Sequence, residues 1–439
     1  MKKHWLLGIV TILILSLVTA CSSGKGGEGA SSSAPAASGK GGSKKELNIL
    51  METVPDTEMV QKVTEKFTQE TGIKVNIEAV NYASMHEKLV PQLLGATSSY
   101  DLIVVDNYWV GEFTDAGWLE PLDSFIKRDK FDTSVYLKSM FDMVGQVEGT
   151  TYMLPFYNYA MALIYRKDVF EDADLKSKYQ AEAGKELKIP DTLEEYVNIS
   201  KFITKQKGES MYGSVMMGLR PDPISVEWLN YLYSSGGDFY NGDNTLRIND
   251  DKAVKALELY VDNMKNAAPK GAAGFGFDEA FNVFAQGNAA SFITYNWMLP
   301  KLQNAAESKV AGKVDIASVP GGTSLNGGWG WAIPKNAEDK EASWQYLKWI
   351  ESFDAAKERA LLGGSPTRKD VLADSDVLGQ FPHYVKVQKI LEASKMIPII
   401  PQAPQLIEIL GRELSEAVSG GKSPKDALDT VAKDVGQLK

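Results

Sequence analysis

The sequence has 439 residues, and its 57 aspartates and glutamates outnumber its 47 lysines and arginines, which gives a formal net charge of −10. This acidic balance argues against a surface built for nucleic acid or for anionic membranes. The chain is long enough for two lobes that each bury a core. Its single cysteine, Cys21, leaves no partner for a disulfide within the chain.

The first 45 residues are predicted to direct export and then to tether the protein. Two lysines precede an apolar run at residues 5–18, which is the pattern of a secretory signal peptide over residues 1–20. The sequence VTAC that ends at Cys21 resembles the bacterial lipobox, in which the cysteine carries the lipid. Residues 21–45 continue as a flexible tether, because they hold no aromatic residue and no aliphatic one larger than alanine. We expect a lipid-anchored protein on the outer face of the cell membrane.

The next part of the chain alternates strands with helices. The hydrophobic pattern predicts strands at 47–51, 73–80 and 101–106, and helices at 56–71 and 84–94. Gly72 stands where a glycine commonly ends a helix. This order is typical of a parallel α/β sheet with helices on both faces.

The remainder of the chain combines β-rich crossovers with further helices. Residues 151–166 are β-prone but interrupted by Pro155, so we expect two strands that meet at a bend. Thr192 and Glu195 have the spacing of a capping box at the start of a helix over 191–206. Further helices are expected at 254–264, 277–285, 342–361 and 423–435, and further strands at 290–294, 314–319 and 329–333.

Two α/β halves joined by such crossovers predict a hinged fold of two lobes. We expect lobe 1 to comprise residues 46–157 and about 326–358, and lobe 2 to comprise residues 158–325 and about 359–439. In open α/β sheets, ligands bind beyond the carboxyl ends of the strands. The cleft between the lobes is therefore the expected ligand site.

Catalytic signatures are scarce in this sequence. After the signal peptide the only histidines are His86 and His383, which favours neither a His-Cys metal site nor a Cys-His nucleophile pair. No HExxH, P-loop or GxSxG pattern occurs. Paired carboxylates are plentiful, so a surface glycoside hydrolase stays an alternative. We predict a protein that is not an enzyme and that uses no metal or cofactor.

Aromatic residues with polar neighbours cluster at predicted strand ends and crossover loops. A single tryptophan is more often part of a core, but this clustering favours a ligand cleft. The C–H face of a sugar or sugar alcohol packs on aromatic rings, and carboxylates and amides bind its hydroxyls. A peptide or metal ligand is the alternative. The candidates are Glu52, Asp106, Tyr108, Trp109, Tyr157, Trp228, Asn296, Trp297, Trp329 and Trp331.

The stretch LNGGWGWAIP holds the last two of these candidates. Its glycines, which are conformationally free, are expected at a bend where the chain returns between the lobes. Trp329 and Trp331 lie two residues apart and would point the same way in a strand. We expect Trp329 to face the ligand, because it lies nearer the loop.

Several segments together resemble a known family. They are KVTEKFTQETGIKVNIEAV, YDLIVVDNYWVGEFTDAGWLEPLDSFI, LPFYNYAMALIYRKDVF, GNAASFITYNW, GGWGWAIPKNAEDKEASWQYLKWI and GGSPTRKDVL. With the lipobox and the tether they resemble the extracellular solute-binding lipoproteins of bacterial ABC importers, in the carbohydrate-binding branch that includes the maltose-binding proteins. The resemblance covers nearly all of the chain after the tether.

This resemblance implies a periplasmic-binding-protein-like α/β fold whose two lobes close on one ligand. It implies that the closed form docks on the transmembrane subunits of an ABC permease. It also adds Arg368, in GGSPTR, to the candidate site. The Tyr108-Trp109 pair replaces part of the polar set of the maltose binders, which favours a smaller or differently shaped polyol. We expect a monomer.

Overall fold

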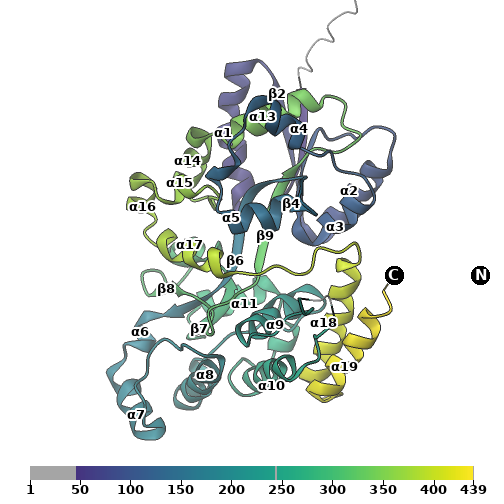
Figure 1. Ribbon diagram of the computed structural model, residues 1–439. Coiled ribbons are helices and arrows are strands. Elements are labelled where there is room, and N and C mark those ends of the chain that lie inside the picture. The colour runs from purple at the N-terminus through teal and green to yellow at the C-terminus, as the bar shows by residue number, and fades with distance from the viewer. Residues whose placement is uncertain (1–45, 243–244, 439) are drawn as a thin grey trace, which may run out of the picture. The chain divides into compact units, whose positions relative to one another are not determined.

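The computed structural model describes residues 46–242 and 245–438 (Figure 1). The predicted signal peptide, the lipidation site at Cys21 and the tether lie outside the described residues. None of the helices in the described part of the chain combines the length and hydropathy of a membrane span.

The described strands form one seven-stranded sheet and a separate short hairpin of β4 and β5. The large sheet has the order β2-β1-β3-β9-β6-β7, and β8 also pairs with β6. The strands are β1 (Glu46–Glu52), β2 (Lys74–Val80), β3 (Leu102–Asp106), β4 (Gln146–Val147), β5 (Thr150–Thr151), β6 (Leu154–Arg166), β7 (Ser291–Tyr295), β8 (Val314–Ala317) and β9 (Asn326–Ala332).

The parallel arrangement predicted for the first three strands is confirmed. β1 runs parallel to both β2 and β3. The next strand of the sheet is antiparallel: β9, from far along the chain, pairs antiparallel with β3. This mixed sheet brings the carboxyl ends of β1 and β3 close to β9.

Helices flank the strands (Figure 1). Helix α1 packs against α13 and α14, and α18 packs against α9, α19 and α3. The helices are α1 (Pro55–Thr71), α2 (Tyr82–Leu94), α3 (Asn107–Asp115), α4 (Asp123–Asp129), α5 (Lys138–Met140), α6 (Lys167–Phe170), α7 (Ala173–Ala183), α8 (Leu193–Lys207), α9 (Asp222–Ser234), α10 (Asp251–Asn266), α11 (Phe277–Ala285), α12 (Met298–Gln303), α13 (Lys340–Ile350), α14 (Phe353–Leu361), α15 (Lys369–Leu372), α16 (Ser375–Gln380), α17 (Tyr384–Ala393), α18 (Ala403–Ser419) and α19 (Pro424–Val435).

Strand β6 links the two parts of the sheet, and the expectation of two separate strands at this point was wrong. Its first part pairs with β9, and its second part pairs with β7 and β8. The register shifts between Pro155 and Asn158. Proline has no N–H to donate to the neighbouring strand. The shift in register accommodates Pro155, so β6 continues as one strand where a break was expected.

The single helix predicted over 342–361 is two helices. α13 ends at Ile350, and α14 begins at Phe353. The Ser352 hydroxyl accepts a hydrogen bond from the Ala355 N–H at 3.3 Å. A serine cap satisfies a free N–H at a helix start and so favours a new helix at this point. The break leaves Glu351 between the two helices, fully buried.

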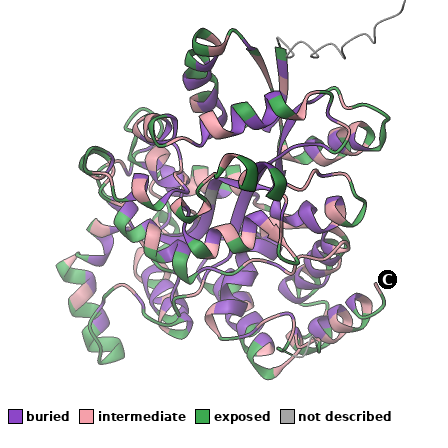
Figure 2. Cartoon of the chain, turned by 45° about the horizontal axis from the view of Figure 1, so that its top comes forward, coloured by how far each residue is buried: buried purple, intermediate pink, exposed green. Residues whose placement is uncertain are grey.

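The glycines before and between Trp329 and Trp331 lie inside β9, so the bend expected there was also wrong. Every residue of β9 is buried, in keeping with the purple strands in the middle of Figure 2, and none of these glycines has a positive φ. Glycine is needed at these positions because neighbouring side chains leave no room for a Cβ atom. A Cβ on Gly328 would lie 2.4 Å from Val144 Cγ2, and one on Gly330 would lie 2.6 Å from Met153 Cβ.

Candidate ligand-binding site

A cavity of about 280 Å³, called here the inner cavity, lies where strand ends and helix starts converge. Glu52 ends β1, Asp106 ends β3 and Tyr295 ends β7. Asp222 and Phe277 begin α9 and α11. Segments from both halves of the chain therefore supply the walls, as expected for a site at the carboxyl ends of strands.

Aromatic rings form a large part of the inner cavity wall. The Trp329 ring meets the Tyr82 ring edge-on at 5.9 Å, and both line the cavity. Behind them, Trp109 stacks on Tyr82 at 5.6 Å and meets Trp329 at 5.5 Å. Trp109 thus supports the wall without lining it. The aromatic lining residues are Tyr82, Tyr108, Tyr159, Phe277, Tyr295, Trp297 and Trp329.

Carboxylates form the polar part of the same wall. Asp106 is buried and caps α3, with Oδ1 accepting from the Tyr108 N–H at 3.1 Å. Burial raises the pKa of Asp106 well above its ordinary value. At Asp222, burial raises the pKa to about 6, and the charge of Glu408 adds to this rise.

Glu52 is the third carboxylate of the wall. The Tyr157 hydroxyl donates to its Oε2 at 2.8 Å. Desolvation raises the pKa of Glu52 to about 7; the hydrogen bond from Tyr157 opposes this rise, and the charge of Asp56 adds to it. Tyr157 is itself fully buried, so it positions the Glu52 carboxylate and does not line the inner cavity.

The Tyr108 hydroxyl is a free polar group in this wall. The side chain is 6% exposed, and its oxygen has no hydrogen-bond partner among the described residues. A buried hydroxyl without a partner is costly, so it is available for a ligand.

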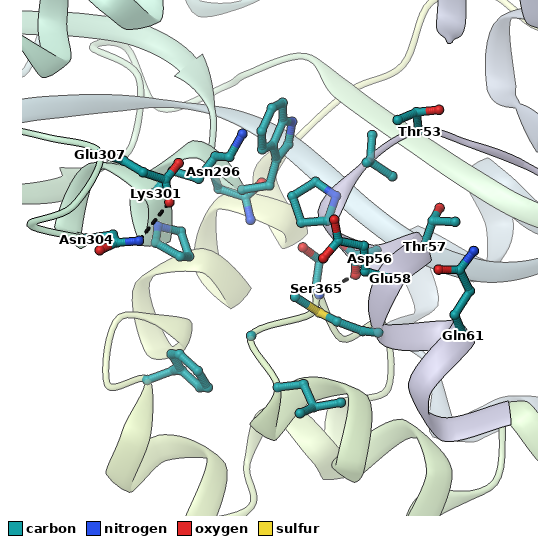
Figure 3. Close-up of a pocket in the computed structure, with 18 of the residues that line it drawn as sticks. Thr53, Asp56, Thr57, Glu58, Gln61, Asn296, Lys301, Asn304, Glu307 and Ser365 are labelled. Carbon is teal, nitrogen blue, oxygen red and sulfur yellow. Dashed lines mark hydrogen bonds between the residues drawn. The ribbon is translucent and has the colours of Figure 1, made fainter. Parts of the chain in front are cut away.

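A larger cavity of about 820 Å³, called here the outer cavity, shares Thr53, Val54 and Trp297 with the inner one. In Figure 3, Asn296, Lys301, Asn304 and Glu307 face a second group across this hollow. That second group includes Thr53, Asp56, Thr57, Glu58, Gln61 and Ser365.

Asn296 and Trp297 stand at the boundary between the two cavities. Asn296 is buried, and its Oδ1 accepts from the Ala160 N–H at 2.9 Å, which fixes the side chain to β6. The Trp297 ring lies 5.7 Å from the Tyr159 ring, and Lys301 Nζ lies 5.7 Å from the Trp297 ring centre. Trp297 is therefore the ring that both cavities share.

Besides Trp109 and Tyr157, three more predicted site residues lie outside both cavity linings. Trp331 is fully buried, its ring packs on Phe156 at 4.2 Å, and its Nε1 donates to Glu351 Oε1 at 3.0 Å. Trp228 is fully buried within α9, away from the helix start where it was expected. Arg368 is also buried and donates to the Glu351 carbonyl at 2.7 Å. Packing in the core leaves none of the three in either wall.

The structure adds lining residues that the sequence reasoning left out of the site. They are Thr53, Val54, Tyr82, Tyr159, Asp222, Val226, Phe277, Asp278, Tyr295 and Gly327. Tyr295 directly follows a predicted strand, so the strand-end rule could have included it. The starts of α2, α9 and α11 carry no comparable signal, because their approach to the cavity depends on tertiary packing. Among the described residues, no group of three or more His, Cys, Asp or Glu could hold a metal ion.

The fold and the cavity define a class of binding protein. The chain belongs to the bacterial extracellular solute-binding protein family, which matches residues 52–357. Members of this family and the similar structures are binding proteins of ABC transporters. The sheet and helices of this chain are those of the two-lobe α/β fold of such proteins.

Particular relatives are similar over most of the chain. An ABC transporter solute-binding protein of Agrobacterium radiobacter K84, solved in complex with ribitol, is 29% identical with a TM-score of 0.78, covering 90% of this chain and 98% of that one. A mannitol-binding protein of Pseudomonas aeruginosa is 25% identical over 325 residues, 69% of each chain. A probable amino-acid ABC transporter periplasmic-binding protein of Sinorhizobium fredii is 23% identical over 390 residues, 88% of this chain and 87% of that one.

Proposed function

We propose that this protein captures a sugar or sugar alcohol in the inner cavity and delivers it to the permease of an ABC importer. The observation that carries the proposal is the convergence of aromatic rings and carboxylates at one group of strand ends. The rings suit the C–H faces of a polyol, and the carboxylates accept hydrogen bonds from its hydroxyls. The ligands named for the Agrobacterium and Pseudomonas relatives are sugar alcohols, which supports the same class here.

The size of the inner cavity favours a small ligand. Its volume of about 280 Å³ lies just below the range of about 300–1,000 Å³ that is typical of small-molecule sites. We propose Glu52, Asp106, Tyr108, Trp297 and Trp329 as direct contacts. Trp109 and Tyr157 act as supports, and Trp228, Trp331 and Arg368 are not retained as contacts.

An amino acid is the alternative that the Sinorhizobium relative suggests. Its α-carboxylate would need a cation or a cluster of N–H donors. No lysine or arginine among the described residues lines the inner cavity. The ligand carboxylate would instead meet Asp106 and Glu52, so a polyol fits better. Binding of a peptide or metal on the same fold, and hydrolysis of a glycoside by paired carboxylates, are competing functions that experiment must separate from polyol capture.

Capture works by population shift. A ligand that contacts both lobes only in the closed form moves the balance from open to closed by its differential affinity. No bond is made or broken, so we propose that the protein is not an enzyme. We retain the predicted lobes of 46–157 with about 326–358, and 158–325 with about 359–439, as part of this proposal. A lipid on Cys21 would hold the monomer at the outer face of the membrane, near its permease.

Thermal-shift measurements on the purified protein test the ligand class. A panel of sugars, sugar alcohols, amino acids, peptides and metal ions is compared, because a ligand that binds the folded state raises the melting temperature. We expect a rise with at least one sugar or sugar alcohol, followed by a saturable isotherm in calorimetry. A response only to amino acids, peptides or metals would refute the assignment, and products formed from labelled oligosaccharides would refute the absence of catalysis.

Membrane attachment is tested separately. Replacing Cys21→Ser should move the full-length protein from the membrane fraction to the medium. A variant that stays with the membrane after washing in high salt would contradict lipid anchoring at this residue.

A further inference from the structure

The inner cavity is acidic as well as aromatic. Four carboxylate side chains line it, and no lysine or arginine among the described residues does. None of the four forms an ion pair within the described part of the chain. Further acidic groups lie behind them, since Asp56 raises the pKa of Glu52 and Glu408 raises that of Asp222. The four lining residues are Glu52, Asp106, Asp222 and Asp278.

The neighbouring groups neutralise little of this charge. Asp106 accepts one backbone N–H, and Glu52 accepts one tyrosine hydroxyl. Lys301 lies over the Trp297 ring but lines only the outer cavity. Burial of unpaired carboxylates is costly, and this cost is reflected in the raised pKa values of Glu52 and Asp222. A cation brought by the ligand would offset it.

Two other features of the wall suit a cation that also carries hydroxyls. The rings of Tyr82, Trp329 and Trp297 line the same cavity as the carboxylates, and aromatic faces attract an ammonium group. The buried Tyr108 oxygen, which has no partner, lies in the same wall and can accept a hydrogen bond from an ammonium or a hydroxyl. This unpartnered group indicates a bound ligand independently of the acidic cluster.

We propose that the ligand is an amino sugar or an aminated sugar alcohol, held with its ammonium group against Asp106 and Glu52 and its hydroxyls toward the rest of the wall. This inference rests on the proposed function and narrows its ligand class. A neutral polyol can donate hydrogen bonds to the same carboxyl groups, but it brings no positive charge that would favour their ionised form. An ammonium forms charge-assisted hydrogen bonds with them and also compensates the charge.

Calorimetry with matched pairs of compounds tests the inference. The pairs are 1-amino-1-deoxysorbitol with sorbitol, glucosamine with glucose, and galactosamine with galactose, at pH 7 and low salt. We expect at least one aminated member to bind about tenfold or more tightly than its neutral partner, with an advantage that shrinks in high salt. Equal or tighter binding of the neutral members in every pair that binds would overturn the inference and leave the proposed function standing.

A further arm separates failure of the inference from failure of the proposed function. Hexylammonium carries the charge without hydroxyls. If it binds while none of the six hydroxylated compounds does, the sugar or polyol assignment fails and this inference fails with it. If nothing in the panel binds, the inference is also overturned, and the wider thermal-shift panel then decides the proposed function.

Variants locate the charge recognition in the inner cavity. Asp106→Asn should reduce the preference for the aminated over the neutral compound about tenfold. If Asp106→Asn fails to fold, Glu52→Gln is measured in its place and should lower the same preference. Asp174→Asn is the matched control, because this exposed carboxylate on α7 pairs only with Lys178 in the ion pairs described. A preference that is unchanged in both cavity variants, or lowered equally in the control, would overturn the inference.

Discussion

Replacing Trp331→Phe should destabilise the protein without weakening ligand binding. Trp331 is fully buried, with its ring between Phe156 at 4.2 Å and Tyr346 at 6.3 Å. Its Nε1 donates to Glu351, a fully buried carboxylate that also accepts from Arg359 Nη2 at 2.8 Å. Phenylalanine keeps an apolar ring here but removes the donor and part of the ring volume.

The expected loss of stability is the sum of these two effects. A hydrogen bond to a charged group contributes about 1.5–3 kcal/mol. The smaller ring leaves a void that costs roughly 1 kcal/mol. The total of about 2.5–4 kcal/mol is a large part of the ~5–15 kcal/mol that stabilises a typical protein, but it still permits folding.

Urea unfolding and calorimetry on the same preparations measure this prediction. Trp349→Phe is the matched control, because its Nε1 donates to Glu70 at the protein surface at 2.8 Å. Exposed hydrogen bonds of this kind contribute little, so the urea midpoint should fall clearly for Trp331→Phe and hardly for Trp349→Phe. An unchanged midpoint together with a weaker affinity for Trp331→Phe would refute the assignment of Trp331 to the core.

The remaining predictions concern the cavity wall and strand β9. Trp297→Ala should weaken ligand binding about tenfold in calorimetry with little change in the urea midpoint, because the ring lines both cavities; a fall in stability alone would make it a core residue. The pKa of Glu52 is raised from 4.5 to about 7, so Glu52 stays protonated to a higher pH in the folded protein than in the unfolded chain. The free energy of unfolding therefore falls as the pH rises between these two values. Glu52→Gln should therefore gain stability relative to the parent between pH 5 and pH 8, and a pH-independent difference would contradict this. Gly330→Ala should lose about 1–3 kcal/mol by urea unfolding, because its Cβ would lie 2.6 Å from Met153 Cβ; Gly379→Ala, which meets nothing within 4 Å, is the control, and equal effects would contradict the packing argument.

Part of the site could be predicted because it follows from local sequence. Glu52 and Asp106 end hydrophobic runs that predict strands, and parallel strands end at the same edge of a sheet. Both residues line the inner cavity. Trp297 follows from the same rule applied to a later strand, whereas Trp329 was expected at the ligand because it lies next to the glycine loop. The prediction needed only strand periodicity and a count of residues past each strand.

The positions of other residues could not be predicted, because they depend on distance along a helix or strand or on packing between helices and strands. Two residues along a strand move a side chain by about 6.6 Å on the same face, which separates Trp329 at the cavity from Trp331 in the core. Tyr82 and Asp222 belong to helix starts that reach the cavity only through the tertiary fold. A pattern in the sequence does not contain that information.

The alternation of glycine and tryptophan in β9 shows how a correct observation led to the wrong structure. Glycine beside bulky rings suggested a flexible bend, because glycine tolerates unusual φ values. In the structure the strand is regular, and the missing Cβ atoms let Val144 and Met153 approach Gly328 and Gly330. Alternate residues of a strand face opposite sides, so close packing against these glycines holds the strand that carries Trp329 in place. An alanine at either glycine would push against this packing and so move the strand that carries Trp329 in the wall of the inner cavity.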